Sequence, residues 1–232
     1  SYAYYLFETQ GRGSETLIME RQMEYVPLFE ESNPVLDLGC GRGEFLDLLR
    51  KNAIPARGID SNPDMVEVCK NKGLDVVCGD AVEYLASHEP DCLGGLFAAQ
   101  VIEHLPAVRI HQLLSNAFRV LKPGGVLLLE TVNTRSPYAL MNYFFRDPTH
   151  HLPIHPETYK FFAEISGFEQ VKISYRSPVP ENERPTLPLH PGEETEITES
   201  LRKLSEAMQH VIDFVYAPCD IVVCGRKPKA FT

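Results

Sequence analysis

The sequence lacks the features that mark membrane-spanning, secreted and zinc-binding chains. No stretch approaches the roughly 20 consecutive apolar residues that a membrane span needs. The opening SYAYYLFETQGRGSE has no charged segment followed by an apolar one, as a secretory signal would. The six cysteines form no CxxC pair and no zinc-ligand spacing, which favours reduced thiols. We therefore expect a cytoplasmic protein with no membrane span and no bound metal.

The chain is also poor in basic residues. Its 22 lysines and arginines face 32 acidic residues, which gives a formal net charge of −10. This charge works against non-specific binding to nucleic acid or to an anionic membrane, so we expect no nucleic-acid partner. With 44% hydrophobic and 23% charged residues, the 232-residue chain has the composition of one globular domain, and we expect a monomer or a homodimer.

Short apolar strands alternate with helices between residues 34 and 132. The predicted strands are 34–39, 55–60, 75–80, 94–102 and 126–132. The predicted helices between them are 43–52, 62–73, 81–88 and 107–121, the last ended sharply by the KPGG segment 122–125. Repeated βα units with nearly continuous apolar strands predict a parallel sheet with helices on both faces.

The rhythm changes outside this core. The remaining predicted elements are an N-terminal helix (14–30), a helix (156–168), a strand (169–176), an amphipathic helix (197–215) and a last strand (220–227). Because 177–196 is rich in proline and acid, we interpret 177–215 as an insertion before the last strand. We therefore expect a single domain with these parts: 1–33, 34–133, 134–176, 177–215 and 216–232.

A glycine-rich turn, DLGCGRGEF, follows the first predicted strand. Gly39 and Gly41 let the backbone turn tightly and approach a ligand at the carboxyl end of that strand. A dinucleotide fingerprint requires a third glycine where this chain has Glu44, and no phosphate-binding lysine follows. Asp37 would repel a pyrophosphate, so the turn suits a cationic ligand.

Polar residues end the next strands as well. Asp60 is placed to accept hydrogen bonds from both hydroxyls of a ribose, and Asp80 to read an adenine edge. Gln100 and Val101 end the fourth strand. We read this edge as carrying carboxylates and no basic residue, which describes a site for a positively charged nucleoside.

The motifs DLGCGRG, GIDSNPDM, CGDAVEYL, QVIEHL and LKPGGVLLLET, in this order, resemble the class I S-adenosylmethionine-dependent methyltransferases. This resemblance implies a doubly wound, Rossmann-like α/β sheet of seven strands with the last strand antiparallel. It implies S-adenosylmethionine as cofactor and S-adenosylhomocysteine as product. Gly39 would lie beside the methionine moiety, Asp60 on the ribose, Asp80 and Ala81 near adenine, and Gln100 under the adenosyl group. The same motifs offer further candidate contacts: Asp37, Cys40, Gly41, Ser61, Met65 and Val101. Cys40 is alternatively a small filler.

The flanking segments YYLFETQGRGSETLI and FFRDPTHHLPIHPETYKFFAEISGFEQVKI are similar to the methyltransferase domain of bacterial O-antigen chain terminators. This resemblance implies a lid over the cofactor that contains Tyr4 and Tyr5. Either Arg12 or Arg21 would pair the cofactor carboxylate. It favours a carbohydrate or sugar phosphate as the acceptor, within polysaccharide biosynthesis, although those relatives carry a kinase region and this chain has no kinase motif.

The segment DPTHHLPIHP carries three histidines. His150 is the leading candidate for a base or positioning group, because imidazole titrates near neutrality; its alternative role is to bridge the loop. Asp147 would orient that imidazole or simply form a turn. His104 would contact substrate or cofactor, or pack under the crevice. Arg146 would bind an anionic acceptor or be solvated. His151, a further candidate for the acceptor side, and His155 are alternatively surface residues, and the prolines between them disfavour a three-histidine metal site.

Two rival functions stay open. A methyltransferase for the oxygen or carbon of a phenolic or isoprenoid molecule would need an apolar pocket, built around Tyr138, Tyr143, Phe144 and Phe145, whereas a glycan site should be open and polar. A non-catalytic protein that binds the cofactor is the other rival. The set of acids at the strand ends predicts binding and does not prove turnover.

Overall fold

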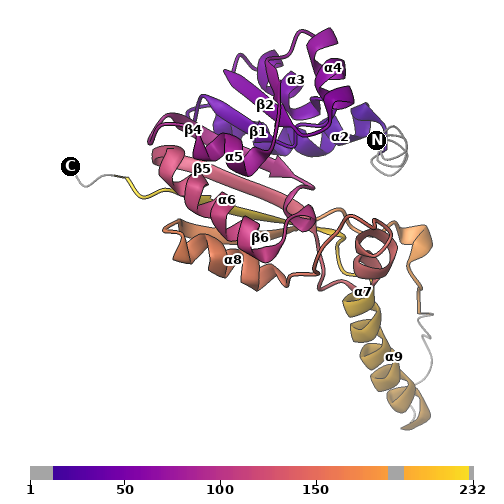
Figure 1. The fold of residues 1–232 in the computed structure, drawn as a ribbon. Helices are drawn as coiled ribbons and strands as arrows, with labels where there is room; N and C mark the ends of the chain where they lie inside the picture. The colour runs from indigo at the N-terminus through magenta and orange to yellow at the C-terminus, as the bar shows by residue number, and fades with distance from the viewer. Residues whose placement is uncertain (1–12, 188–195, 230–232) are drawn as a thin grey trace.

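The computed structural model of the chain describes residues 13–187 and 196–229, which form a layered α/β fold around one sheet (Figure 1). The sheet has seven strands in the order β3-β2-β1-β4-β5-β7-β6. Their bounds are β1 Val35–Leu38, β2 Ala56–Asp60, β3 Val76–Cys78, β4 Leu93–Ala99, β5 Leu121–Val132, β6 Glu169–Arg176 and β7 Asp220–Arg226. Strand β7 runs antiparallel to both of its neighbours, and the other described pairs are parallel. The predicted fold class is confirmed.

Helices cover both faces of the sheet. One face packs against α2 (Glu15–Gln22), η1 (Met23–Phe29), α3 (Glu44–Lys51) and α4 (Pro63–Asn71). The other packs against α5 (Ala81–Ala86), α6 (Ala107–Val120) and α8 (Pro156–Ile165). Strands buried on both faces explain the continuous apolar runs of the sequence. None of the helices within the described residues is long and apolar enough to cross a membrane.

Two elements differ most from the sequence prediction. The N-terminal helix ends at Gln22 and continues as the 3-10 helix η1, in which Pro27 cannot donate a backbone hydrogen bond to an α-helix. Strand β5 begins at Leu121, which pairs with Leu93 of β4, so the KPGG segment lies inside the strand rather than before it. A register shift in the β4 pairing accommodates this segment.

The chain between β6 and β7 leaves the sheet. It contains the short helix η4 (Glu181–Glu183) and the helix α9 (Glu196–Val215). Figure 1 shows α9 as an arm that projects away from the sheet and its covering helices, with its C-terminal end beside α7 (Pro137–Ala139). The insertion before the last strand therefore lies where the sequence predicts it.

Candidate functional site

A cavity of about 410 Å³ opens where the carboxyl ends of the parallel strands meet the start of β7. Small-molecule sites are typically of this size, and in doubly wound sheets ligands bind at this edge. The strand ends, the helix α2 and the segment 143–150 contribute to its lining. Lining residues include Arg21, Asp37, Gly39, Cys40, Gln100, His104, Glu130, Val132, Tyr143, Arg146, Asp147, His150, Ser177, Cys219 and Asp220.

The glycine-rich turn forms one wall of the cavity. Gly39 has a φ of +65°, and a Cβ added there would lie 2.4 Å from Cγ2 of Val101, so only glycine fits. Asp37, only 2% exposed, lies just before the turn in β1. The backbone amide of Gly41 donates to Oδ2 of Asp60 over 2.8 Å, which ties the turn to the end of β2.

The acids that end β2 and β3 are held by backbone groups. Asp60 also accepts from the backbone amide of Asn62 over 2.8 Å, so its carboxylate is oriented on both sides. Oδ1 of Asp80 caps α5 and pairs with Arg109 of α6 at 2.6 Å. The strand ends themselves carry no basic residue, as predicted, but α6 adds Arg109 to this edge of the sheet. Arg109 was missed because α6 reaches this edge only through its packing beside α5.

Two further acids, from β5 and β7, line the cavity. Burial, and then the charge of Asp220, raises the pKa of Glu130 to about 7. Burial also raises the pKa of Asp220. Glu130 accepts from the hydroxyl of Tyr25 over 2.5 Å, and Asp220 from Nε2 of Gln100 over 3.1 Å. Gln100 has a φ of +56°, a strained conformation for a residue with a Cβ. Buried carboxylates favour a cationic ligand. The positive charge of Arg21 partly opposes the rise in pKa that burial causes in both acids.

Two imidazoles, of His104 and His150, lie beside each other in the lining of the cavity, with ring centroids 4.6 Å apart. Nδ1 of His150 lies 2.7 Å from the carbonyl oxygen of Phe144, which can only accept, so Nδ1 carries the proton. Nδ1 of His104 lies 2.8 Å from the hydroxyl of Thr149, and that hydroxyl donates to Asp147 over 2.6 Å. In the neutral form, each histidine therefore has its lone pair on Nε2, where it can accept a proton.

Asp147 anchors this arrangement. Partial burial works to raise its pKa, but two hydrogen bonds from Thr149 and the neighbouring imidazoles lower the pKa below its ordinary value. The carboxylate therefore stays charged and holds the Thr149 hydroxyl in one orientation. Through this hydroxyl the carboxylate also fixes the orientation of the His104 imidazole.

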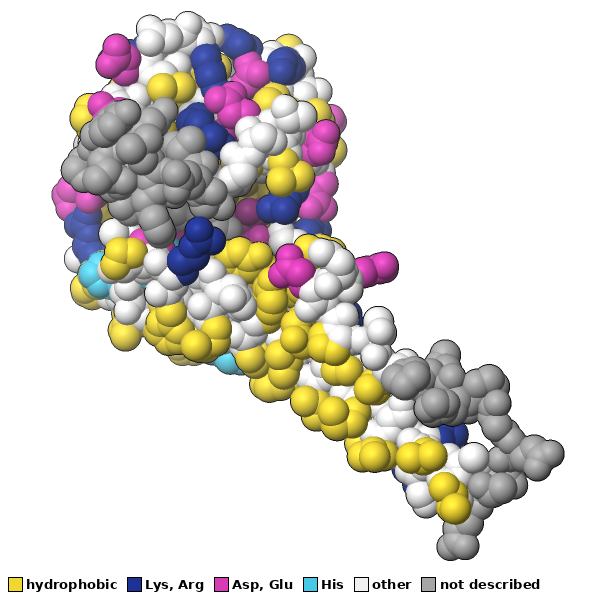
Figure 2. All heavy atoms as spheres, turned by 90° about the vertical axis from the view of Figure 1, so that its right-hand side faces the viewer, with side chains coloured by type: hydrophobic (Ala, Val, Ile, Leu, Met, Phe, Trp, Pro, Cys, Tyr) yellow, Lys and Arg dark blue, Asp and Glu magenta, His cyan; other side chains and the backbone are white. Residues whose placement is uncertain are grey.

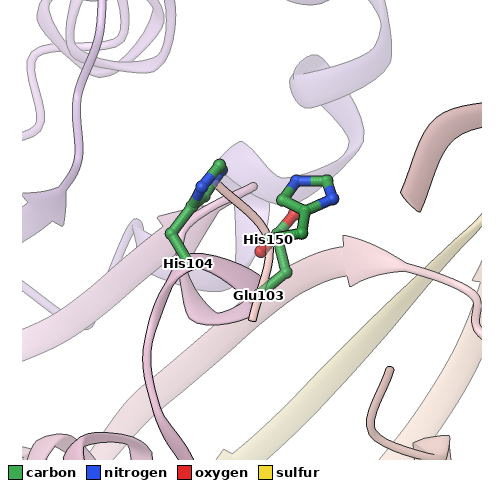
Figure 3. A group of neighbouring side chains, drawn as sticks. All are labelled: Glu103, His104 and His150. Carbon is green, nitrogen blue, oxygen red and sulfur yellow. The ribbon is translucent and has the colours of Figure 1, made fainter. Parts of the chain in front are cut away.

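Glu103 comes close to the same two histidines (Figure 3). It lies with His104 on the 3-10 helix η2 (Ile102–His104) after β4, whereas His150 comes from the segment after η3 (Leu140–Phe144). Its carboxyl is 1% exposed and lacks a well-formed hydrogen bond. Burial raises its pKa to about 8. Potential ligand atoms of Glu103, His104 and His150 lie within 4.8 Å of one another, so among the described residues this group could hold a metal ion.

Ten of the twenty predicted site residues line this cavity, whereas Asp60 and Asp80 lie outside the described lining. Arg146 and Tyr143 line the cavity with the two histidines, whereas His151 is exposed and is absent from the described lining. The backbone amide of His151 donates to the carbonyl of Glu103 over 2.9 Å, which fixes the loop rather than an acceptor. His155 caps α8. The predicted lid residues Tyr4, Tyr5 and Arg12 lie outside the described residues.

The remaining predicted cofactor residues lie in the turns after the strands or in the first turns of the helices that follow. Cys40 lines the cavity in the glycine-rich turn, and Val101 packs against Gly39 at the opposite side of that turn. Ser61 follows β2, Met65 is buried in the first turn of α4, and Ala81 begins α5.

Besides Arg109, three residues of the site were not identified from the sequence: Glu130, Asp220 and Thr149. Glu130 and Asp220 are polar residues at the ends of otherwise apolar strands, a signal that could have identified them. Thr149 has no such signal, because an aspartate, proline and threonine in a loop also form an ordinary turn.

Solved structures show the same fold. A structure described as a SAM dependent methyltransferase from Archaeoglobus fulgidus is 37% identical, covers 97% of this chain and 99% of its own, and superposes with a TM-score of 0.89. A phosphoethanolamine N-methyltransferase 2 from Haemonchus contortus, in complex with S-adenosyl-L-methionine, is 16% identical, covers 96% of this chain and 59% of its own, and has a TM-score of 0.62. At that identity it shows the fold alone.

Curated relatives are similar over part of their length. Ubiquinone biosynthesis O-methyltransferase of Mus musculus is 26% identical over 146 residues, which are 59% of this chain and 39% of that protein. Its namesake from Xanthomonas oryzae pv. oryzae is 31% identical over 110 residues, 45% of each chain. The chain thus spans less than half the length of these relatives.

A sequence profile of the family described as "Methyltransferase domain" matches residues 12–173. The turn that admits only glycine, the acids at the strand ends and the cationic preference of the cavity fit S-adenosylmethionine, which carries a sulfonium and an ammonium group. The chain therefore belongs to the class I S-adenosylmethionine-dependent methyltransferases, and it is an enzyme that takes S-adenosylmethionine as its cofactor.

Proposed function

We propose that this methyltransferase methylates a hydroxyl of a carbohydrate or sugar phosphate in the cytoplasm, with His150 as the base. The observation that carries the proposal is the pair of imidazoles whose Nδ1 atoms are both engaged by the protein, at 2.7 Å and 2.8 Å. In His150 this engagement of Nδ1 leaves the lone pair of the neutral imidazole on Nε2, from which it can take a proton. A histidine base of this kind suits an acceptor whose nucleophilic atom carries a proton that must be removed.

The reaction is an in-line displacement in which an oxygen–methyl bond forms as the methyl–sulfur bond breaks. A sugar hydroxyl is a poor nucleophile while it is protonated, and a positioned base typically contributes on the order of 10²- to 10⁴-fold. In our proposal, Nε2 of His150 takes the hydroxyl proton. His104, held through Thr149 by Asp147, lies beside His150 and helps to position the acceptor molecule.

The mouth of the cavity favours a polar acceptor. Arg146 is exposed, lines the cavity and makes no ion pair within the described part of the chain, so its guanidinium is available to a phosphate or another anionic group. Asp147 and the two histidines add further polar groups on the same side. The similarity of the flanking segments to the methyltransferase domain of O-antigen chain terminators supports the same acceptor class.

A phenolic hydroxyl is the second candidate, because the curated relatives are named as ubiquinone biosynthesis O-methyltransferases. Of the four aromatic residues expected to build a pocket for it, Tyr143 lines the cavity. Phe144 is 2% exposed and packs into the core, whereas Phe145 is 59% exposed. Tyr138 bonds to Glu183. This arrangement supports a polar acceptor over an aromatic one.

Transfer of radiolabelled methyl groups to a panel of nucleotide sugars, sugar phosphates, oligosaccharides and phenols tests the proposal. We expect label on the carbohydrates, and we expect phosphorylated acceptors to have a lower KM than neutral ones. Arg146→Ala should raise the KM of phosphorylated acceptors more than the KM of neutral acceptors. Label on the phenols alone would refute the carbohydrate proposal and establish the second candidate.

A further inference from the structure

The helix α9 carries a stripe of large apolar side chains that the rest of the described structure leaves exposed. Figure 2 shows hydrophobic side chains running along the projecting arm. The stripe consists of Ile197, Leu201, Leu204, Met208 and Val211, with exposed fractions between 43% and 73%. Val215, half-buried where the arm joins the body, continues it. Exposed apolar surface of this extent marks an interaction site.

The spacing within the stripe is that of a coiled coil. Its six members are separated by four, three, four, three and four residues, which places them alternately at the d and a positions of a heptad repeat. This repeat is narrower than the face that a helix presents to a globular core. The stripe therefore fits one partner helix rather than a flat surface.

The sequence of the stripe identifies that partner. When two copies of α9 run antiparallel about a centre at residue 206, Leu204 meets Met208 of the other copy, Leu201 meets Val211, and Ile197 meets Val215. Every a position then faces a d position, as antiparallel packing requires, and the helix dipoles oppose each other favourably. The apolar stripe of one α9 helix therefore matches the stripe of a second, antiparallel copy.

The positions that flank the stripe also permit self-pairing. They carry no charge: Thr198, Ser200, Ser205, Ala207, Ile212 and Phe214. Like charges at these positions would repel a second copy. The charged residues lie on the outer face, where Arg202 pairs with Glu199 at 2.8 Å and with Glu206. With three acidic and two basic residues from 197 to 215, the helix is a poor ligand for an anionic membrane.

We propose that the enzyme forms a homodimer in which the α9 arms of two copies pair antiparallel along this stripe. Two such faces remove on the order of 1,000 Å² from solvent, which is at the lower end of specific interfaces. The interface lies on the insertion and leaves the strand ends of each copy to their own cavity. Dimerisation is therefore independent of which acceptor the enzyme takes.

Sedimentation of the full chain tests the proposal. We expect twice the monomer mass of 26.2 kDa at micromolar concentration. Leu204→Lys should give a monomer that still binds S-adenosylhomocysteine, whereas Gln209→Lys, on the outer face, should stay dimeric. A wild-type monomer, a dimer that survives Leu204→Lys, or a monomer that sediments with lipid vesicles would each overturn the proposal.

Cysteine crosslinking tests the orientation. In the antiparallel pair, oxidation should link Leu201→Cys to Val211→Cys only when the two variants are mixed, because ten residues of helix separate these positions by ~15 Å along the axis. Links within each variant alone would show a parallel pair and overturn the arrangement. Wild-type protein is the control, since Cys78 is exposed.

Discussion

Nδ1 of His104 lies 2.8 Å from the hydroxyl oxygen of Thr149, a residue that sequence analysis did not select. The same hydroxyl donates to Asp147 over 2.6 Å, so Thr149 transmits the orientation of a charged carboxylate to an imidazole that lines the cavity. In our proposal, Thr149 is thus a positioning residue for the acceptor side of the site.

Thr149→Val should lower kcat by about tenfold while S-adenosylhomocysteine affinity stays unchanged, because the isosteric methyl removes both hydrogen bonds of the hydroxyl and releases His104. The pH profile of kcat should shift as well, since His104 loses its link to the carboxylate. Steady-state kinetics across pH and calorimetry measure the two effects. Thr149→Ser should restore wild-type behaviour, and an unchanged profile in Thr149→Val would contradict the link.

His150→Ala should lower kcat by roughly 10²- to 10⁴-fold with little change in cofactor affinity, because the variant loses the proposed base and keeps the strand-end acids. Single-turnover kinetics with the true acceptor measure the loss. His155→Ala is the matched control: His155 caps α8 in the same loop segment, and its loss should leave kcat unchanged. Undiminished turnover of His150→Ala would remove the histidine from the reaction.

The alternation of strands and helices was predictable because it depends on local patterns. Apolar runs, the caps at Asn62 and the stop at Gly73 act within a few residues, so α4 and its neighbours lie close to their predicted ranges. Strand β5 was predicted to start five residues late, because nothing local shows that Leu121 pairs with Leu93 across the sheet. The start of β5 therefore depends on pairing between residues that are far apart in the sequence.

The candidate site likewise contains residues that local sequence patterns reveal and residues that only the three-dimensional fold brings into place. Asp37 lies in β1 and Asp60 ends β2, two strands that are visible in the sequence, and both lie where they were expected. Asp220 reaches Gln100 only because β7 inserts between β5 and β6 in the sheet, a consequence of topology that no local pattern contains. Arg109 likewise meets Asp80 through helix packing.

Asp60→Ala should weaken binding of S-adenosylhomocysteine by at least about tenfold, since the carboxylate both faces the predicted ribose position and holds the amide of Gly41. Titration calorimetry measures the loss. Asp75→Ala removes an exposed acid paired with Arg57 on the adjoining strand and should leave affinity unchanged. Equal affinity in the wild type and Asp60→Ala would remove Asp60 from the cofactor site.

Glu103 should make the protein less stable as pH rises. Its pKa is raised by burial from 4.5 to about 8, so the folded state keeps a proton that the unfolded chain releases. The contribution to stability is therefore fully present below pH 4.5, falls between pH 4.5 and 8, and is constant above. Glu103→Gln mimics the protonated acid. Its free energy of unfolding should exceed that of the wild type by at least about 1 kcal/mol at pH 9, with a smaller difference at pH 5.

Urea unfolding at the two pH values measures this difference. Glu157→Gln, at an exposed position, is the control and should leave the free energy of unfolding unchanged at both pH values. A Glu103→Gln variant that is equally destabilised at both pH values would mean that the carboxylate is needed in its charged form.

Treatment with a chelator should leave methyl transfer unchanged. Glu103, with a pKa raised to about 8, is mostly protonated at neutral pH and is then a poor ligand. The Nε2 atoms of His104 and His150 serve the acceptor in our proposal. Assays before and after EDTA, with metal analysis of the purified protein, decide between the two uses of this group. A different result would identify a metal site built from the same three side chains: the chelator removes activity, magnesium, manganese or zinc restores it, and Glu103→Gln has no activity with or without metal. His150 would then act as a ligand rather than as the base.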